Sequence, residues 1–156
     1  TYPISQLNGT PQVAVVYASG DITVTSGVGL VLLWDAETLD TGGFHSTSTN
    51  TGRLTVTTAG YYRLVTSIVV TAGSGGSFAA VNVTIRFQKN GSSNIRQVYV
   101  PVIASDLTTL FMSEVVLAAA DDYYEVTITQ SSGVNLIVES GNSISAFSIE
   151  KLNGTT

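Results

Sequence analysis

The stretch that most constrains the fold of this chain is a run of aromatic and branched residues, 61–70, directly after Gly60. Gly60 lacks a Cβ and can turn the backbone sharply before the run. The run itself has the composition of a long β-strand, in which side chains alternate between two faces. One face carries Tyr62, Leu64, Thr66, Ile68 and Val70. The opposite face carries Tyr61, Arg63, Val65, Ser67 and Val69. Because the first set is mostly apolar and the second mixed, we expect a central strand with one core face and one partly covered outer face.

Strand signals continue along the chain, separated by turns. Asn90-Gly91 is the strongest hairpin signal, because both residues tolerate the positive φ of a type I′ turn. Pro101 has no N–H to donate, so its strand should lie at a sheet edge or a bulge. The expected strands cover residues 13–18, 30–34, 53–57, 61–70, 79–89, 95–103, 110–117, 123–130, 134–139 and 143–152.

Apolar residues nowhere recur at helical spacing between caps, although residues 110–120 resemble a helix most. Phe111, Val115 and Val116 favour a strand there. Eight to ten strands separated by Gly, Asn and Ser turns predict an all-β sandwich or barrel. We expect one domain at residues 13–156, preceded by an arm at residues 1–12 that has no periodicity. The expected core residues are Tyr62, Leu64, Ile68, Val83, Ile85, Phe87, Val126 and Ile128.

The composition bears on association. Charged residues make up 11% of the chain, against about 25% in a typical globular protein. Hydroxyl and amide groups must therefore supply most of the surface polarity. The chain is either a monomer coated with hydroxyl groups or an obligate oligomer that buries its faces. We favour the oligomer, because a surface with so few charges is poorly protected against association.

Several classes of partner are disfavoured. The net charge of −5 and the scattered cations give no basic patch for nucleic acid. No apolar run approaches the ~18 residues of a membrane span. The absence of Cys excludes disulfides and thiol chemistry. Residues 1–12 have neither the basic start nor the apolar middle of a signal peptide.

Catalytic signals are weak. His45 is the only histidine, and no Gly-Xaa-Ser-Xaa-Gly or Walker sequence is present. We therefore expect no enzyme, and no zinc or iron site. Calcium needs only oxygen ligands, so it stays a weak possibility, with solvated loop carboxylates as the favoured alternative. The calcium candidates are Asp35, Glu37, Asp40, Asp121 and Asp122.

Aromatic side chains could stack on sugars if they are exposed. The candidates for glycan stacking are Trp34, Phe44, Tyr61 and Tyr123. The alternative, which we favour, is that these rings lie in the core or in a subunit interface.

Three sequence motifs resemble a known family. The first is Leu54, followed after five intervening residues by Gly60-Xaa-Tyr62-Xaa-Leu64. The stretch 121–126 with the turn 130–133 is the second, and the ending from Phe147-Ser148 to Leu152 is the third. Together these motifs resemble the complement-type globular head domain, a relative of the tumour necrosis factor jelly roll.

The resemblance implies a jelly-roll β-sandwich of about ten antiparallel strands that forms tight homotrimers and has no catalytic activity. The residues expected at the trimer interface are Tyr99, Phe111, Tyr124 and Phe147. Similar domains occur on bacteriophage surfaces, and a short, cysteine-free chain of low charge fits that setting.

The function expected first is that of a virion structural protein of a bacteriophage, a capsid decoration (cement) or head-fibre protein on the particle surface. Residues 1–12 would then contact other virion proteins. Two alternatives stay open: a receptor-binding fibre-tip module that recognises host surface glycans, and a secreted complement-like ligand domain. Each inference from fold to function is analogy.

Overall fold

The computed structural model describes residues 10–73, 80–103 and 107–152, and within these ranges the chain forms twelve β-strands and no helix. No described helix, therefore, could cross a membrane. The strands are β1 (Val13–Tyr17), β2 (Ile22–Val24), β3 (Leu30–Val31), β4 (Ala36–Asp40), β5 (Arg53–Thr55), β6 (Gly60–Ala72), β7 (Val81–Lys89), β8 (Ser93–Val102), β9 (Thr108–Ala118), β10 (Tyr123–Thr129), β11 (Leu136–Val138) and β12 (Ala146–Leu152).

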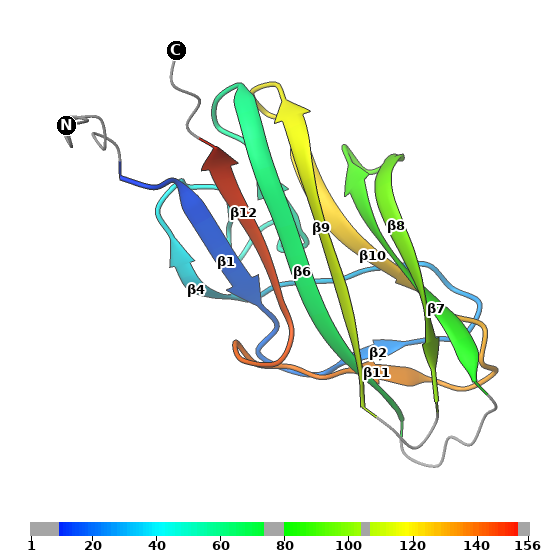
Figure 1. Cartoon of the computed structure of the whole chain (residues 1–156). Coiled ribbons are helices and arrows are strands. Elements are labelled where there is room, and N and C mark those ends of the chain that lie inside the picture. The colour runs from blue at the N-terminus through cyan, green and yellow to red at the C-terminus, as the bar shows by residue number, and fades with distance from the viewer. Residues whose placement is uncertain (1–9, 74–79, 104–106, 153–156) are drawn as a thin grey trace, which may run out of the picture.

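The strands form two antiparallel sheets that face each other as a sandwich (Figure 1). The larger sheet has the order β2-β11-β6-β12-β1-β4, with β9 also paired to β6. The smaller sheet has the order β3-β10-β7-β8, with β5 also paired to β10. The predicted all-β sandwich is confirmed. Two strands beyond those expected, β2 and β4, are short and lie at the two ends of the larger sheet.

Strand β6 is the centre of the larger sheet, as its sequence predicts. It pairs with β9 from Gly60 to Val70 on one side, and with β12 and then β11 on the other. The face that begins with Tyr62 is buried throughout. On the opposite face Tyr61 and Arg63 are exposed and the next three residues are half-buried. The alternation in the sequence therefore gave the correct orientation of this strand.

The core lies between the inner faces of the two sheets. All eight residues expected in the core are fully buried. Phe87 of β7 stacks on Phe147 of β12 with 5.7 Å between ring centroids, which joins the two sheets. Trp34 lies 6.2 Å from the same Phe147 ring. Large aromatic rings therefore pack against one another in the core of the sandwich.

The two local predictions about β7 and β8 are confirmed. Asn90 and Gly91 have φ values of +53° and +73°, the positive angles of a type I′ turn. The N–H of Ser92 closes the turn on the carbonyl of Lys89. Among the described strands β8 pairs with β7 alone, so Pro101 lies on an edge strand. An edge strand is a position where a proline, which has no N–H to donate, is tolerated.

The described chain begins and ends at one corner of the larger sheet, where Val13 pairs with Glu150 (Figure 1). Residues 1–9 of the expected arm lie outside the described residues. The carbonyl of Pro11 accepts a 2.6 Å hydrogen bond from the Thr41 hydroxyl. The carbonyl of Gln12 accepts one from the N–H of Lys151. The end of the arm nearest the domain is thus hydrogen-bonded to it, and the division into arm and domain stays a prediction.

Candidate functional site

Two of the four residues expected at the trimer interface are buried inside the subunit, and that expectation is wrong for them. Tyr124 and Phe147 are both fully buried, whereas Tyr99 and Phe111 are 61% and 60% exposed. Tyr124 shares its face of β10 with Val126 and Ile128, which points it into the core. Phe147 pairs with Phe87 across the sandwich. Tyr99 and Phe111 lie on the surface, and their role at an interface stays a prediction.

The burial of Tyr124 also changes its acidity. Loss of hydration, with the nearby Asp122 carboxylate and Tyr62 ring as smaller causes, raises the pKa of Tyr124 to about 12. Its hydroxyl is buried and has no hydrogen-bond partner among the described residues. Tyr124 therefore stays neutral and contributes packing.

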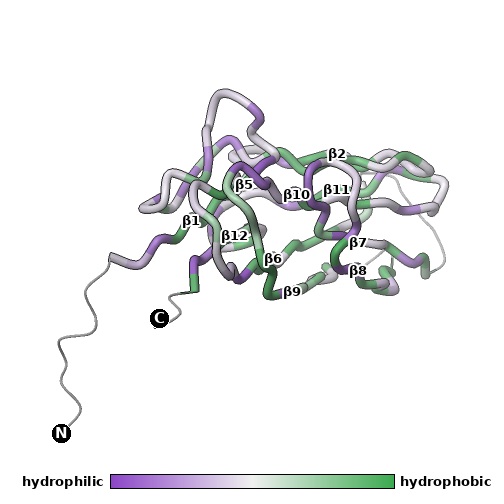
Figure 2. The backbone as a smooth tube through the Cα atoms, turned by 90° about the horizontal axis from the view of Figure 1, so that it is seen from above, coloured by the Kyte–Doolittle hydropathy of each residue, from purple (hydrophilic) through white to green (hydrophobic). Residues whose placement is uncertain are grey.

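The outer face of the larger sheet carries a strip of exposed apolar side chains. We call this set the outer strip: Tyr61, Phe111, Val115 and Leu117, which are 57%, 60%, 49% and 66% exposed. Tyr61 on β6 pairs directly with Leu117 on β9, so side chains of both strands form one surface. Apolar residues, in green, are visible in both β6 and β9 in Figure 2. Four of the exposed large apolar side chains of the described residues thus lie on one face of two adjacent strands.

The outer strip has little charge around it. Arg63 pairs with Val115 across the two strands, and its guanidinium lies 3.7 Å from the carboxylate of Glu150 on β12. The two opposite charges balance each other. Ser67 and Ser113 supply the small polar side chains of the same face. A flat, nearly neutral face with exposed aromatic and aliphatic groups is suited to association with another protein surface.

The sequence reasoning named Phe111 but missed Val115 and Leu117. Residues 110–117 are apolar at both odd and even positions, so one apolar set must point outward whichever set enters the core. That double-sided pattern was the available signal for an interface.

Of the four aromatic residues considered for glycan stacking, two are buried, and the hypothesis is wrong for them. Trp34 and Phe44 are fully buried, and the Phe44 ring packs edge-on against Tyr62 at 5.8 Å. The Arg53 guanidinium covers one face of the half-buried Tyr123 ring, 4.0 Å from its centroid. Of these four, Tyr61 alone is exposed, and it belongs to the outer strip.

The five calcium candidates fall in two regions: Asp35, Glu37 and Asp40 lie at or in β4, and Asp121 and Asp122 lie just before β10. Asp35 accepts hydrogen bonds from the hydroxyl and N–H of Ser19, which lower the pKa of its carboxyl. Asp40 accepts from three backbone N–H groups of residues 42–45. Asp122 lies 2.6 Å from the ammonium of Lys89. Among the described residues no group of three or more His, Asp or Glu side chains converges on one point. The structure therefore does not bring these carboxylates together.

The only histidine fixes a loop. The ring of His45 is fully buried, with Nδ1 2.7 Å from the Glu37 carboxylate and Nε2 3.1 Å from the carbonyl of Thr51. Both ring nitrogens therefore face acceptors of the protein itself. Next to it, the Ser46 hydroxyl is hydrogen-bonded within its own loop, to Ser48 and Thr49. The arrangement gives no serine nucleophile with a histidine base.

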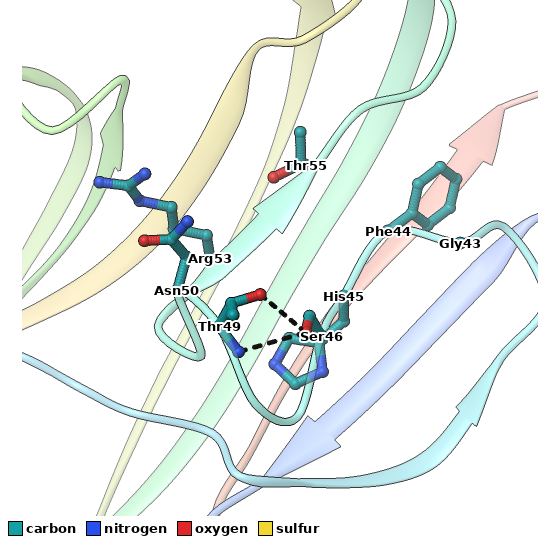
Figure 3. A pocket seen from close by; sticks show the side chains of 8 residues that line it. All are labelled: Gly43, Phe44, His45, Ser46, Thr49, Asn50, Arg53 and Thr55. Atoms are coloured by element: carbon teal, nitrogen blue, oxygen red, sulfur yellow. Dashed lines mark hydrogen bonds between the residues drawn. The ribbon is translucent and has the colours of Figure 1, made fainter.

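A hollow of about 200 Å³ opens beside this loop (Figure 3). Its lining residues are Gly43, Phe44, His45, Ser46, Thr49, Asn50, Arg53 and Thr55. Arg53, the one cation in this lining, is paired with Glu125 at 3.0 Å. With its polar groups largely bonded to one another, this hollow is best explained as part of the loop structure.

Two antiparallel sheets packed face to face, with no helix among the described residues, define the class of the molecule as an all-β sandwich. No model of a protein family matches the sequence, and no curated protein matches it either. Solved structures do match. Murine APRIL is 10% identical with a TM-score of 0.66, and the match covers 92% of this chain and 100% of that one.

Two further structures agree. The tumour necrosis factor Eiger from S. frugiperda is 14% identical with a TM-score of 0.65, and the match covers 95% of this chain and 96% of that one. The globular domain of zebrafish complement 1qA protein is 11% identical with a TM-score of 0.61, covering 92% and 99%. The resemblance drawn from the sequence motifs is confirmed for the fold, which is all that such low identity shows.

Proposed function

We propose that this protein is a non-enzymatic, homotrimeric jelly-roll module of a bacteriophage virion, a capsid decoration (cement) or head-fibre protein on the particle surface. The observation that carries the assembly part of this proposal is the outer strip. Its four apolar side chains are about half exposed or more, and they lie on adjacent strands. Water contact with such a patch is unfavourable by roughly 25 cal/mol per Å². Burial against further copies of the chain removes that cost.

The virion setting has separate support. The chain has few charges and no Cys, and its sequence resembles domains that occur on phage particles. The number of subunits in the assembly, three, is taken from the same family resemblance. The described chain starts and ends at one corner of the larger sheet, and contact of residues 1–12 with other virion proteins would take place near that corner.

The mass in solution tests the assembly. Three copies of 16.3 kDa give 48.9 kDa, and we expect light scattering on a sizing column to report that mass. A mass of one subunit at micromolar concentration would refute the trimer.

Variants of the outer strip test its role. We expect the double variant Phe111→Ser, Leu117→Ser to run as a folded monomer, because each change removes about 1.5–3 kcal/mol of buried side chain from the interface. The control is Leu33→Ser, which replaces an apolar residue of similar exposure, 56%, outside the strip. If the double variant stays trimeric, the interface lies elsewhere.

Capsid binding tests the virion role. The full chain should bind purified capsids that lack it, and deletion of residues 1–12 should weaken binding without changing the trimer. Failure of the full chain to bind such capsids would contradict the decoration role.

The alternative of a secreted ligand domain is favoured by the fold shared with APRIL, Eiger and complement 1qA. It predicts saturable binding to animal cells and none to capsids, so the same labelled trimer, applied to both, distinguishes the two functions.

A further inference from the structure

The outer face of the smaller sheet carries a hollow that neither the core nor the outer strip explains. It measures about 220 Å³ and lies over β10 and β7. Arg86 of β7 is the direct partner of Thr127 of β10, so a guanidinium and a hydroxyl lie side by side in its lining. The lining residues are Gly29, Leu30, Val31, Arg86, Gln88, Thr127 and Thr129.

Arg86 is a fixed cation with unused hydrogen-bond donors. Its Nε donates to the side-chain oxygen of Gln97 and its Nη1 to the hydroxyl of Thr129, both at 3.1 Å. A guanidinium has five N–H donors, so most of this fork stays available. Among the described residues no carboxylate forms an ion pair with it, whereas Arg53, Arg63 and Arg96 each pair with a glutamate. An oriented guanidinium without a counter-ion is suited to a carboxylate ligand.

Thr127 provides an independent indication of a ligand. Thr127 is 7% exposed, and its Oγ1 is one of four buried side-chain atoms without a hydrogen-bond partner among the described residues. Of these four residues, Thr127 alone lines this hollow. A buried hydroxyl without a partner destabilises a fold, so native proteins seldom retain one. Thr127 lines the hollow beside Arg86, so rotation of its side chain about the Cα–Cβ bond would bring Oγ1 within reach of a ligand oxygen.

The size and chemistry of the hollow narrow the ligand class. Its volume is below the roughly 300–1,000 Å³ of pockets for drug-sized ligands, so about one ring fits. Gln88 gives its amide N–H to Asn94 and keeps its carbonyl oxygen to accept a hydrogen bond. Val31, the direct partner of Thr127 on β10, gives this face an apolar wall. One cation, several groups that pair with hydroxyls and an apolar wall match a sugar ring that carries a single carboxylate.

The hollow continues along the sheet. Thr129 also lines a second hollow of about 190 Å³, whose lining is uncharged. Its other residues are Gly27, Asn82, Thr84, Gln130 and Ser131. Hydroxyl and amide groups of this kind would pair with a neutral sugar unit next to the acidic one.

We propose that this face binds an acidic sugar of the uronic or sialic acid class, with its carboxylate on Arg86 and its ring hydroxyls on Thr127 and Gln88. The site lies on the smaller sheet, so it goes beyond the assembly function and does not depend on it. Bound to glycans, the protein would attach a particle or a cell to a carbohydrate-coated surface.

The direct test is titration of the full chain by NMR, with D-glucuronate, N-acetylneuraminate, D-glucose and acetate as separate probes. At least one of the two sugar acids should shift the amides of Arg86 and Thr127, with a dissociation constant roughly tenfold or more below those of D-glucose and acetate. If neither acid shifts these amides, or if acetate binds as tightly, the site does not recognise an acidic sugar.

Two variants and a control complete the test. Arg86→Gln should abolish the preference for the acid over D-glucose. Thr127→Val keeps the shape of the side chain, so it should raise the Tm of the free protein and weaken binding of the acid. Arg96→Gln, on the neighbouring strand β8, should leave the affinity unchanged. The proposal is overturned if either site variant binds the acid as tightly as the wild type, or if the control loses as much affinity. The mass of each variant on a sizing column shows whether the substitution also changes assembly.

Discussion

Single carboxylates hold individual turns of this protein. Asp40 binds the backbone N–H groups of the loop that follows β4, at 2.9–3.1 Å. Asp122 performs the same role at the start of β10, where it accepts from the N–H of Ala119 and the side chain of Asn90. Asn90 in turn accepts from the N–H of Tyr123. With few charged residues in the chain, each of these contacts is a specific local constraint.

Gly91 should be sensitive to substitution. Its φ of +73° disfavours any residue with a Cβ, and an added Cβ would lie 2.9 Å from the Tyr123 hydroxyl. We expect Gly91→Ala to lower the free energy of unfolding by about 1–2 kcal/mol. The control is Gly20→Ala, where an added Cβ meets nothing within 4 Å. Urea denaturation measures both, and equal stability of the two variants would contradict the steric explanation.

Asp122 should make stability depend on acidity. Burial opposes ionisation there, but hydrogen bonds from Lys89, Asn90 and Ala119 prevail and lower the pKa below its ordinary value of 3.8. The stabilisation of the fold by the ionised carboxylate of Asp122 is therefore complete above about pH 3.8. It is lost as the pH falls through the folded-state pKa.

Asp122→Asn should consequently be less stable than the wild type near neutral pH, and the difference should shrink in acid. Melting curves of both proteins across the acidic range test this. Asp121→Asn, at the exposed neighbouring position, is the control. A difference that stays constant with pH would exclude Asp122 as the cause.

Strand β9 combines two surfaces in one element. Leu110, Met112 and Val116 enter the core, and Phe111, Val115 and Leu117 point outward. The strand pairs with β6 on one side only, so it is an edge of the larger sheet. An apolar edge strand is a liability for aggregation unless another surface covers it. The element itself therefore favours assembly.

Substitution of Phe147 should destabilise the fold, whereas substitution of Phe111 should weaken association between subunits. Phe147→Ala should cost about 3–5 kcal/mol of folding stability, because it opens a cavity between the sheets. Phe111→Ala should leave the fold intact and weaken association. Circular dichroism and sizing of both variants separate these effects. If Phe147→Ala stays fully stable but loses its assembly, the ring belongs to the interface after all.

The whole molecule is a sandwich in which one sheet offers an apolar outer face and the other a polar one with hollows. The first face fits self-association and the second fits a ligand, so the two proposed activities need not compete for surface. The separation arises because β6 and β9 carry apolar residues on both faces, whereas β7 and β10 carry mostly polar residues outward.

Assembly through the first face should make thermal stability depend on concentration. A trimer that dissociates on unfolding gains stability by mass action, so its Tm should rise with protein concentration. The Phe111→Ser, Leu117→Ser variant should show a constant Tm. Melting curves over a roughly hundredfold range of protein concentration check this. A wild-type Tm that stays constant over this range would contradict assembly coupled to folding.

The sequence by itself determined the direction of the side chains in three long strands and the position of the sharpest turn. Alternation fixed the faces of β6, β7 and β10, because period-two patterning is local. Asn90-Gly91 fixed a hairpin for the same reason. Alternation also placed Tyr124 in the core with Val126, against the interface role given to it.

The tertiary structure alone decided which loop and outward-facing residues are covered. Trp34 and Phe44 lie outside regular strands, where no alternation of side chains indicates burial. Both are nevertheless buried in the core. Thr127 points outward by alternation yet is buried, because Val31 of β3 and Arg86 of β7 flank it. Pairings between residues far apart in the chain create these environments, so no local pattern can reveal them.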